Sequence, residues 1–438
     1  MTDPVADLLS FLDRSPTPYH AVAECVARLE RAGFRALDAG ARWKLDAGDK
    51  RYCVRGDGSL VAFEIGQAPV ADAGFRWIGA HTDSPNLRVK PLPDASAHGY
   101  QRVAVETYGG VLLHTWLDRD LSLAGRVTLR GANGPTTVLV DFARPLLRVP
   151  NLAIHLYREI RTDGLKLNAQ THGIPVLGLE DAPALPELLL QELRAQDLAP
   201  KSVAASDLLG FDLMAYDTQP ACVSGARGEF VQAARLDNLA SCHSAVSALL
   251  DAGAAGPSRV HRGFVLYDHE EVGSRSAQGA GGPLLAETLE RIAGGTKDAA
   301  PDSLARALTR SVLVSADMAH ALHPNYADRH EPGHQPRIGA GPVIKINANQ
   351  SYASDAVTGG LFADLCQQAG LEPQYFVARN DMGCGSTIGP ISAARVGMPT
   401  VDVGNPMLSM HSCREMAGSA DVAPMIDVLT RFLAPGDG

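Results

Sequence analysis

The residues best suited to chemistry follow a short apolar run near the middle of the chain. Residues 264–267 (FVLY) have the composition of a buried strand, and residues 268–271 (DHEE) come directly after them. Carboxylates this close repel one another and lose solvation when the strand end is covered, unless a cation lies between them. A solvated turn is the ordinary explanation of such a cluster. A metal site therefore requires matching ligands from other strand ends.

Other predicted strands end on the same types of side chain. In open α/β sheets, functional groups collect beyond the carboxyl ends of the strands, because loops there vary while the sheet holds them rigidly. A single His or Asp at a loop start is commonly a cap or a turn residue, but five such strand ends favour a shared site. The candidates are His81 with Asp83, Asp237, Glu270 with Glu271, Asp317 with His320 and His323, and His411.

This set of side chains has the composition of a dinuclear metal site. Two imidazoles and three carboxylates suit a pair of divalent ions that share one carboxylate, with one His and one further carboxylate on each ion. Two ions about 3.5 to 4 Å apart would neutralise the repulsion between the carboxylates. Neighbouring residues that leave a strand point in different directions, so one of Glu270 and Glu271 can bind metal while the other accepts a proton from water. The spacing leaves open which glutamate has which role.

Composition excludes several classes of protein. The chain has 438 residues, 45% hydrophobic and 20% charged, which is enough for one large domain and a smaller one. Its net charge of −10 without basic runs argues against a nucleic-acid partner. No apolar stretch is long enough to span a membrane, and the first residues lack the pattern of a signal peptide, so we expect a cytoplasmic protein. Seven scattered cysteines form no C-x-x-C pair and predict neither disulfides nor a zinc finger.

Alternating helix and strand signals frame the candidate site. Thr17 can cap a helix that begins at Pro18 and ends at Gly33. Strands are predicted at 60–65 and 75–80, and after about residue 230 strands alternate with helices to the end of the chain. The predicted helices in that part cover about 239–250, 361–369 and 425–433. This alternation predicts an α/β domain with a mostly parallel sheet flanked by helices.

The middle of the chain has a different texture. From about residue 93 to 230, short strand-like runs such as RVAVETY and TTVLV are separated by Gly, Asn and Pro, with few convincing long helices. We therefore expect a β-rich domain at 93–230, inserted into an α/β domain formed by 1–92 and 231–438.

Eight segments between about residue 79 and 418 occur in the order found in one enzyme family. They are GAHTDSPNLRVKP, LAIHLYRE, ARLDNLAS, DHEEVGSRSAQGA, SADMAHALHPNY, GPVIKINANQSYASD, MGCGSTIGP and NPMLSMHSCREM. In these segments the chain resembles the M18 aminopeptidases, whose eukaryotic members are called aspartyl aminopeptidases, and it is most similar to the bacterial branch.

The resemblance implies a fold and a role for each candidate. The fold would be a zinc-exopeptidase (phosphorylase/hydrolase-like) three-layer α/β/α catalytic domain, with the inserted domain serving dimerisation and oligomerisation. Asp237 would bridge the two ions, Glu270 would be the general base, and Asp83 would orient His81. The implied metal ligands are His81, Asp237, Glu271, Asp317 and His411.

Three further residues receive a role from the resemblance. Lys345 occupies the position where the family recognises an acidic substrate side chain, although a lysine in an apolar strand is commonly a snorkelling surface residue. His155 matches a histidine that reaches the active site of a neighbouring subunit, although on its own it would be an ordinary strand-face histidine. His323 is expected to line the substrate pocket.

The predicted function is a metalloaminopeptidase that prefers peptides with N-terminal Asp or Glu. Its cofactors would be two divalent ions, zinc first, with manganese or cobalt as alternatives. The family also implies self-association, from homodimers up to a dodecamer. One alternative is a broad-specificity aminopeptidase or another amide hydrolase of the same fold. The other is a non-catalytic assembly or cargo protein, which would lack chelator-sensitive peptidase activity.

Overall fold

The computed structural model describes residues 3–434, which fall into two compact units. The first unit contains the residues up to Asp83, Ala221–Met410 and the residues from Glu415 onward. The second contains Ser84–Pro220 and His411–Arg414. The chain thus passes between the units at Asp83/Ser84 and Pro220/Ala221, about ten residues before the positions near 93 and 230 that the sequence predicts.

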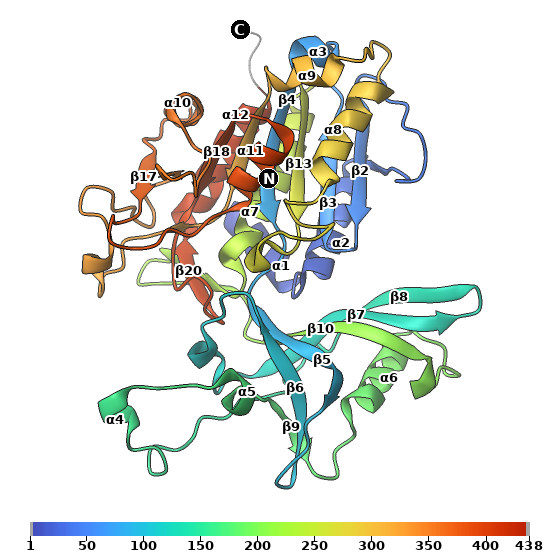
Figure 1. Cartoon of the computed structure of the whole chain (residues 1–438), viewed down its shortest axis with the longest axis vertical. Coiled ribbons are helices and arrows are strands. Elements are labelled where there is room, and N and C mark those ends of the chain that lie inside the picture. The colour runs from blue at the N-terminus through green and yellow to red at the C-terminus, as the bar shows by residue number, and fades with distance from the viewer. Residues whose placement is uncertain (1–2, 435–438) are drawn as a thin grey trace. The chain divides into compact units, whose positions relative to one another are not determined.

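A nine-stranded sheet forms the centre of the first unit (Figure 1). Its order is β1-β2-β3-β13-β4-β14-β18-β16-β17, and the neighbouring strands from β13 to β18 are parallel. The remaining neighbours include antiparallel pairs, among them β3 with β13 and β16 with β18. The strands are β1 (Arg35–Ala36), β2 (Lys50–Arg55), β3 (Ser59–Glu64), β4 (Phe75–His81), β13 (His261–Tyr267), β14 (Val312–Ala316), β16 (Val343–Ile346), β17 (Gln374–Val377) and β18 (Thr400–Gly404).

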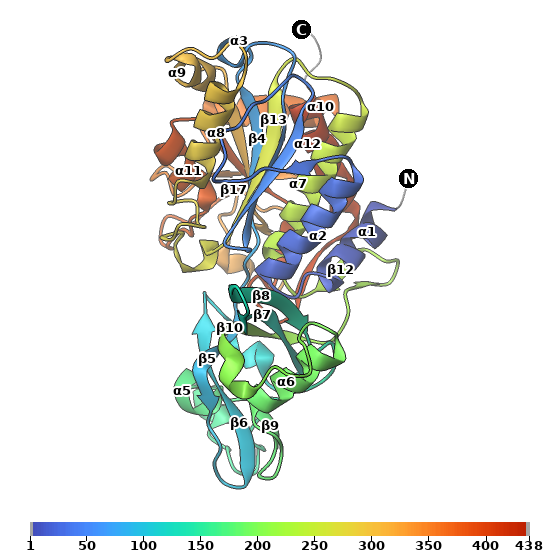
Figure 2. The same ribbon diagram turned by 90° about the vertical axis from the view of Figure 1, so that its right-hand side faces the viewer.

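Helices cover both faces of this sheet, as Figure 2 shows. Successive strand residues point to opposite faces. In β13, Phe264 and Leu266 pack with α1, α2, α7 and α12, whereas Val265 and Tyr267 pack with α8, α9 and α11. The predicted three-layer α/β/α fold is therefore confirmed. The helices are α1 (Pro4–Asp13), α2 (Pro18–Arg31), α3 (Val70–Ala73), α7 (Leu236–Ala254), α8 (Leu284–Gly295), α9 (Ser303–Leu308), α10 (Ala356–Gln368), α11 (Ile388–Val396) and α12 (Val422–Leu433).

Local signals explain where several helices begin. The Thr17 hydroxyl caps α2 by accepting a hydrogen bond from the His20 N–H, as the sequence predicts. The predicted helices at 239–250, 361–369 and 425–433 lie in or overlap α7, α10 and α12. Helix α1, capped by Asp3, was not expected. Among residues 3–434, no helix has the length and apolar composition needed to cross a membrane.

A smaller sheet of five strands in the first unit holds segments next to the candidate site. Its order is β11-β12-β20-β19-β15. Strand β12 ends four positions before Asp237, and β15 begins two positions after Asp317. The five strands are β11 (Cys222–Ser224), β12 (Phe230–Ala233), β15 (Ala319–His320), β19 (Pro406–Leu408) and β20 (Glu415–Gly418).

The second unit is built on a six-stranded antiparallel sheet of order β8-β7-β10-β5-β6-β9. Helix α6 (Leu185–Ala195) buries Leu189 and Leu193 against the core of this unit. The sequence did not predict this helix, because its leucine-rich run lies among strand and turn signals. The strands are β5 (Asn86–Asp94), β6 (Tyr100–Tyr108), β7 (Leu121–Gly131), β8 (Gly134–Asp141), β9 (Val176–Leu179) and β10 (Leu208–Asp217), with two short helices, α4 (Ile160–Asp163) and α5 (Ala169–His172).

Candidate metal centre

Three adjacent parallel strands end at one edge of the large sheet and carry the candidate ligands. In the register of the sheet, Tyr267 of β13 lies opposite His81 of β4, and Ser315 of β14 lies opposite Gly79 of β4. The residues that follow β13 and β14 are 268–271 and Asp317. Since parallel strands place their carboxyl ends together, groups distant in the sequence meet here.

One imidazole and several carboxylates converge at this edge. The His81 Nε2 atom lies 3.5 Å from Asp237 Oδ1 and 3.6 Å from Asp317 Oδ1. His81, Asp237 and Glu271 each present one ligand atom, and these three atoms lie within 4.8 Å of one another. His81, Asp237 and Asp317 are buried, and Glu271 is half-buried. Imidazole with carboxylates at this spacing suits a divalent ion such as zinc, so the residues fit the expected cofactor.

The segment that carries Asp237 is fastened to two sheets. The Asp237 N–H donates to Glu415 Oε2 of β20 at 3.0 Å, and the next residue, Asn238, donates from Nδ2 to the Ala316 carbonyl of β14 at 2.9 Å. Asp237 itself is non-helical (φ −81°, ψ 106°) although it stands at the start of α7. Sequence reasoning did not single out Glu415. Glu415 is buried at the first position of β20, and its partner is distant in the sequence, so no local pattern identifies it.

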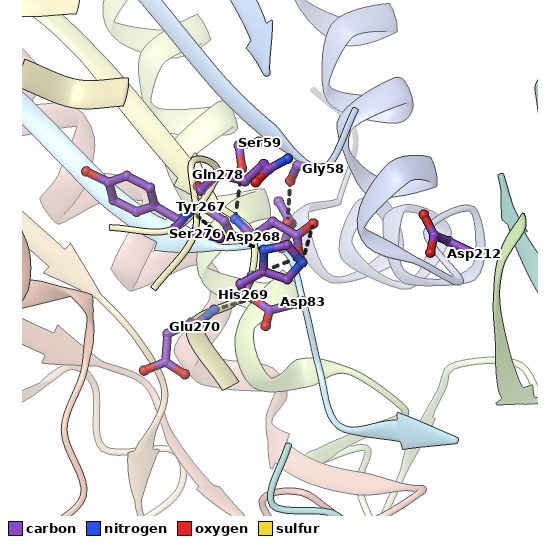
Figure 3. A network of polar contacts seen from close by, with 12 residues as sticks. Gly58, Ser59, Asp83, Asp212, Tyr267, Asp268, His269, Glu270, Ser276 and Gln278 are labelled. Carbon is purple, nitrogen blue, oxygen red and sulfur yellow. Dashed lines mark hydrogen bonds and ion pairs between the residues drawn. The ribbon is translucent and has the colours of Figure 1, made fainter. Parts of the chain in front are cut away.

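Asp83 connects His81 with the two glutamates. His81 Nδ1 lies 3.0 Å from the Asp83 backbone carbonyl and 3.5 Å from its Oδ1 atom. The Asp83 carboxylate accepts the N–H groups of Glu270 and Glu271, each at 3.1 Å, and Figure 3 shows it beside the Glu270 backbone. The backbone carbonyl is thus the closest partner of Nδ1, with Nε2 directed to the cluster. The Asp83 side chain also holds the turn that carries the glutamates, and its expected role in orienting His81 stays a prediction.

The electrostatics of the cluster match the repulsion inferred from the DHEE segment. Burial raises the pKa of Glu270 to about 7; Asp317, Asp83 and Asp237 add to the shift, and His81 opposes it. Burial, and next the charge of Asp237, raise the pKa of Glu271 well above its ordinary value. A cation placed among carboxyl groups with such raised pKa values would stabilise their ionised forms.

Lys345 lies at the edge of the same cluster. The side chain is buried, and its Nζ atom is 3.5 Å from Asp317 Oδ2. Nζ also donates to the Met318 carbonyl at 3.2 Å and lies 5.3 Å from the centre of the Tyr352 ring. Lys345 is therefore an interior lysine beside the carboxylates rather than a snorkelling surface residue.

The remaining candidates lie elsewhere. His323 packs against Tyr326, with ring centres 4.9 Å apart, and lines a pocket of about 270 Å³ together with His320. His155 is exposed in a loop of the second unit. His411 also belongs to the second unit, where its Nδ1 atom is 3.2 Å from the Gly110 carbonyl. The first unit brings together His81, Asp83, Asp237, Glu270, Glu271, Asp317 and Lys345, whereas the roles of His155 and His411 stay predictions.

The chain is similar to bacterial aminopeptidases over nearly its whole length. Residues 11–433 match the family model described as aminopeptidase I zinc metalloprotease (M18). A probable M18 family aminopeptidase 2 of Pseudomonas aeruginosa (strain UCBPP-PA14) is 48% identical, and the match covers 98% of each chain. The protein of the same description from Streptomyces coelicolor is 47% identical over 98% of this chain and 97% of the relative.

Solved structures share the fold. Ape4, in its complex with Nbr1, is 40% identical with a TM-score of 0.93, covering 98% of this chain and 85% of that one. The mApe1 dodecamer of S. cerevisiae is 28% identical, with a TM-score of 0.85 and coverage of 98% and 96%. An M18 family aminopeptidase from Thermotoga maritima has the same fold at 22% identity, with a TM-score of 0.83 and coverage of 98% and 95%. The chain therefore belongs to the M18 family of zinc metalloaminopeptidases, which are hydrolases.

Proposed function

We propose that this chain is a dinuclear aminopeptidase that prefers peptides with an N-terminal Asp or Glu. The observation that carries the proposal is the convergence of His81, Glu271 and Asp317, at the ends of adjacent strands, with Asp237 at the start of α7. Five residues would hold two divalent ions, zinc first, with Asp237 shared between them. These residues are His81, Asp237, Glu271, Asp317 and His411.

Glu270 would be the general base. When bound, the metal ions would polarise the scissile carbonyl and lower the pKa of the attacking water. Asp83 fixes the Glu270 backbone, and the carboxylate of Glu270 points away from that contact in Figure 3. The Glu270 carboxylate, next to the proposed metal ligand Glu271, would take a proton from the attacking water and return it to the leaving amine.

Lys345 would recognise the acidic side chain of the substrate. Its ammonium group is buried beside Asp317. A substrate carboxylate would make a charge-assisted hydrogen bond with it, whereas a Leu side chain would not. Lys345→Met should therefore lower kcat/KM for Asp-anilide by about 10- to 100-fold, which is the cost of losing a hydrogen bond to a charged group. Leu-anilide should lose little, and equal losses for both would remove Lys345 from the specificity pocket.

The function is tested with a panel of Asp-, Glu-, Leu- and Ala-anilides. Each is assayed with the protein as purified, after EDTA, and after zinc, manganese or cobalt is added back. The expected result is hydrolysis that EDTA abolishes and metal restores, fastest for Asp and Glu. Equal rates for the four substrates would indicate a broad-specificity aminopeptidase. Absence of any chelator-sensitive hydrolysis would indicate a non-catalytic assembly protein.

We also infer that the chain forms a homo-oligomer. The similarity to the mApe1 dodecamer supports this, as do exposed apolar side chains near His155, with Leu152 58% and Leu156 74% exposed. In an oligomer His155 would contribute to the site of a neighbouring copy. Sedimentation combined with an activity assay tests this, and a fully active monomer would contradict the role of His155.

A further inference from the structure

Asp402 is a fully buried carboxylate beside Lys345 that the mechanism does not use. It lies in β18, where antiparallel pairing places Val343 opposite Gly404 and Ile344 opposite Val403. Lys345 and Asp402 are the next residues on the two strands beyond the pair of Ile344 and Val403. Burial raises the pKa of Asp402, and the charge of Lys345 opposes that shift. Asp402 is thus a close electrostatic neighbour of Lys345.

The two carboxylate oxygens of Asp402 join two separate loops. Oδ1 accepts a hydrogen bond from the Thr387 hydroxyl at 2.6 Å, and Oδ2 accepts one from the Ala353 N–H at 2.6 Å. The Asp402 N–H donates to Ser354 Oγ at 2.8 Å, which adds a contact to the second loop. Asp402 therefore links the loop at 347–355, after β16, with the loop at 378–387, after β17.

A glycine makes this close approach sterically feasible. A Cβ atom at Gly389, in the first turn of α11, would collide with both carboxylate oxygens of Asp402. Thr387 caps the same helix and accepts the Gly389 N–H at 3.2 Å. In the glycine-rich segment MGCGSTIGP, Gly389 is therefore the residue that lets Asp402 reach the start of α11.

The first loop carries a side chain that lies against Lys345, and the second carries one that packs against that side chain. Tyr352, from the first loop, is buried with its ring centre 5.3 Å from Lys345 Nζ. Cys384, from the second loop, packs in the same small cluster. Burial raises the pKa of the Tyr352 phenol, and a hydrogen bond with Cys384 contributes to that shift. Tyr352, which borders Lys345, is thus packed between the two loops that Asp402 joins.

We propose that Asp402 is a positioning residue for substrate selection. By joining Ala353 and Thr387, it holds Tyr352 and Cys384 in place so that the Lys345 ammonium group meets an acidic N-terminal side chain in a fixed geometry. This inference rests on the proposed function, in which Lys345 recognises that side chain. Displacement of a recognition group by even about 1 Å is costly to catalysis.

Two substitutions at Asp402 separate this role from general stabilisation. Asp402→Ala removes both acceptors, and we expect the ratio of kcat/KM for Asp-anilide over Leu-anilide to fall about tenfold, mainly through KM for Asp-anilide. Asp402→Asn can still accept the Ala353 N–H and donate to Thr387 Oγ1, because a hydroxyl oxygen has two acceptor sites. This variant should keep the ratio within about twofold of the wild type.

A milder matched pair covers the case in which Asp402→Ala does not fold. Thr387→Val removes the hydroxyl donor, whereas Thr387→Ser keeps it. In the Val variant we expect the selectivity ratio to fall about threefold, a limited loss because the contact from Ala353 remains. The Ser variant should keep the wild-type ratio. Equal ratios in these two folded variants would overturn the proposal.

The results have distinct meanings. A wild-type ratio in Asp402→Ala with a lower Tm would overturn the inference, because Asp402 would then serve stability alone. An Asp402→Asn variant as unselective as Asp402→Ala would also overturn it, because charge and not bridging would matter. Lys345→Met is assayed alongside. If Lys345→Met leaves the ratio unchanged, the acidic preference itself fails and the inference with it; if Lys345→Met loses selectivity and Asp402→Ala does not, the inference alone fails.

Discussion

The two ends of β13 bury polar side chains in opposite ways. At the N-terminal end of β13, the Arg262 guanidinium is 3.0 Å from both carboxylate oxygens of Glu64 and donates to the Gly256 carbonyl at 2.7 Å. His261 beside it accepts the Gly66 N–H at Nδ1 and has Nε2 3.1 Å from the Ala68 carbonyl. Each buried group at this end has a partner of complementary charge or hydrogen-bonding character.

Beyond the C-terminal end of β13, several negatively charged groups lie close together. Glu270 and Glu271 follow β13 and meet Asp237 and Asp317 around the single imidazole of His81, and burial together with mutual repulsion raises the pKa of both glutamates. A fold can keep such a region when it serves a reaction, because perturbed acids in a cluster mark functional sites more often than structural ones. The contrast teaches that balanced buried charge indicates structure and unbalanced buried charge indicates chemistry.

The largest expected effect is a loss of activity after a substitution at the C-terminal end of β13. Glu270→Gln should lower kcat on Asp-anilide by about 10³- to 10⁴-fold, because the amide cannot accept the proton of the attacking water. The fold and the zinc content should stay unchanged, as measured by circular dichroism and metal analysis. The matched control is Glu287→Gln, at a half-exposed residue that pairs with Arg55. A Glu270→Gln enzyme with near-normal kcat would show that another group is the base.

Substitutions at the N-terminal end of β13 should lower the stability of the protein and leave its activity unchanged. Arg262→Met leaves Glu64 charged and buried, so the free energy of unfolding should fall by about 3 to 5 kcal/mol in urea titrations. The double variant Arg262→Met/Glu64→Leu should recover most of this loss, since no charge is then left without its partner. Folded molecules of both variants should keep wild-type kcat/KM. A single variant as stable as the wild type would show that this pair does not balance the buried charge.

His261, at the N-terminal end of β13, should make the stability of the protein depend on pH. Burial lowers the pKa of His261 to about 4, and protonation at Nδ1 would break the bond from the Gly66 N–H. Because the folded state favours the neutral form, this contribution is complete above the unfolded pKa of about 6.5 and is lost as pH falls toward 4. It amounts to about 3 kcal/mol.

Urea titrations at about pH 7.5 and about pH 4.5 measure this contribution. His261→Gln should remove that part of the stability difference, whereas His98→Gln, at an exposed position, should keep it. If the wild type and His261→Gln lose the same stability between the two pH values, the buried neutral His261 is not the cause.

Metal removal should give the smallest effect, and it should destabilise the wild type more than the Asp237→Asn variant. Zinc at about 100 times its dissociation constant should stabilise the wild type by about 2.7 kcal/mol, because it binds the folded state. Asp237→Asn removes one of the repelling carboxylates, so its metal-free form should be more stable than the metal-free wild type, with little gain from zinc. Thermal unfolding with EDTA or zinc measures both. A metal-free Asp237→Asn protein that is less stable than the metal-free wild type would mean that the carboxylates do not repel.

Sequence patterns predicted the strand ends but not all the contacts that hold them. His81, Glu271 and Asp317 stand at or after the ends of β4, β13 and β14, which parallel pairing brings together. Asp237 comes instead from the start of α7, which follows β12 of the smaller sheet. Glu415 supports Asp237 from β20, 178 positions along the chain, so no local pattern points to it. The contact of His81 with the backbone carbonyl of Asp83 was also hidden, because a side-chain pattern does not predict which backbone atoms approach.

The inserted unit shows the same limit in its secondary structure. Its strands were predicted from short alternating runs, whereas α6 was missed because its apolar face becomes clear only against the sheet that Leu189 and Leu193 cover. For Asp402 the sequence shows an acid within an apolar strand, and its partners Ala353 and Thr387 come from two loops that meet only in the folded chain.

Zinc binding by chelator-stripped protein tests the central claim most directly. Calorimetric titration and metal analysis of the dialysed protein give the number of ions per chain in the wild type, in Asp237→Asn and in Glu270→Gln. The account predicts about two ions in the wild type and in Glu270→Gln and a clear loss in Asp237→Asn, because Asp237 is proposed as the shared ligand. A wild-type protein that binds no zinc, or an Asp237→Asn protein that binds as much as the wild type, would contradict it.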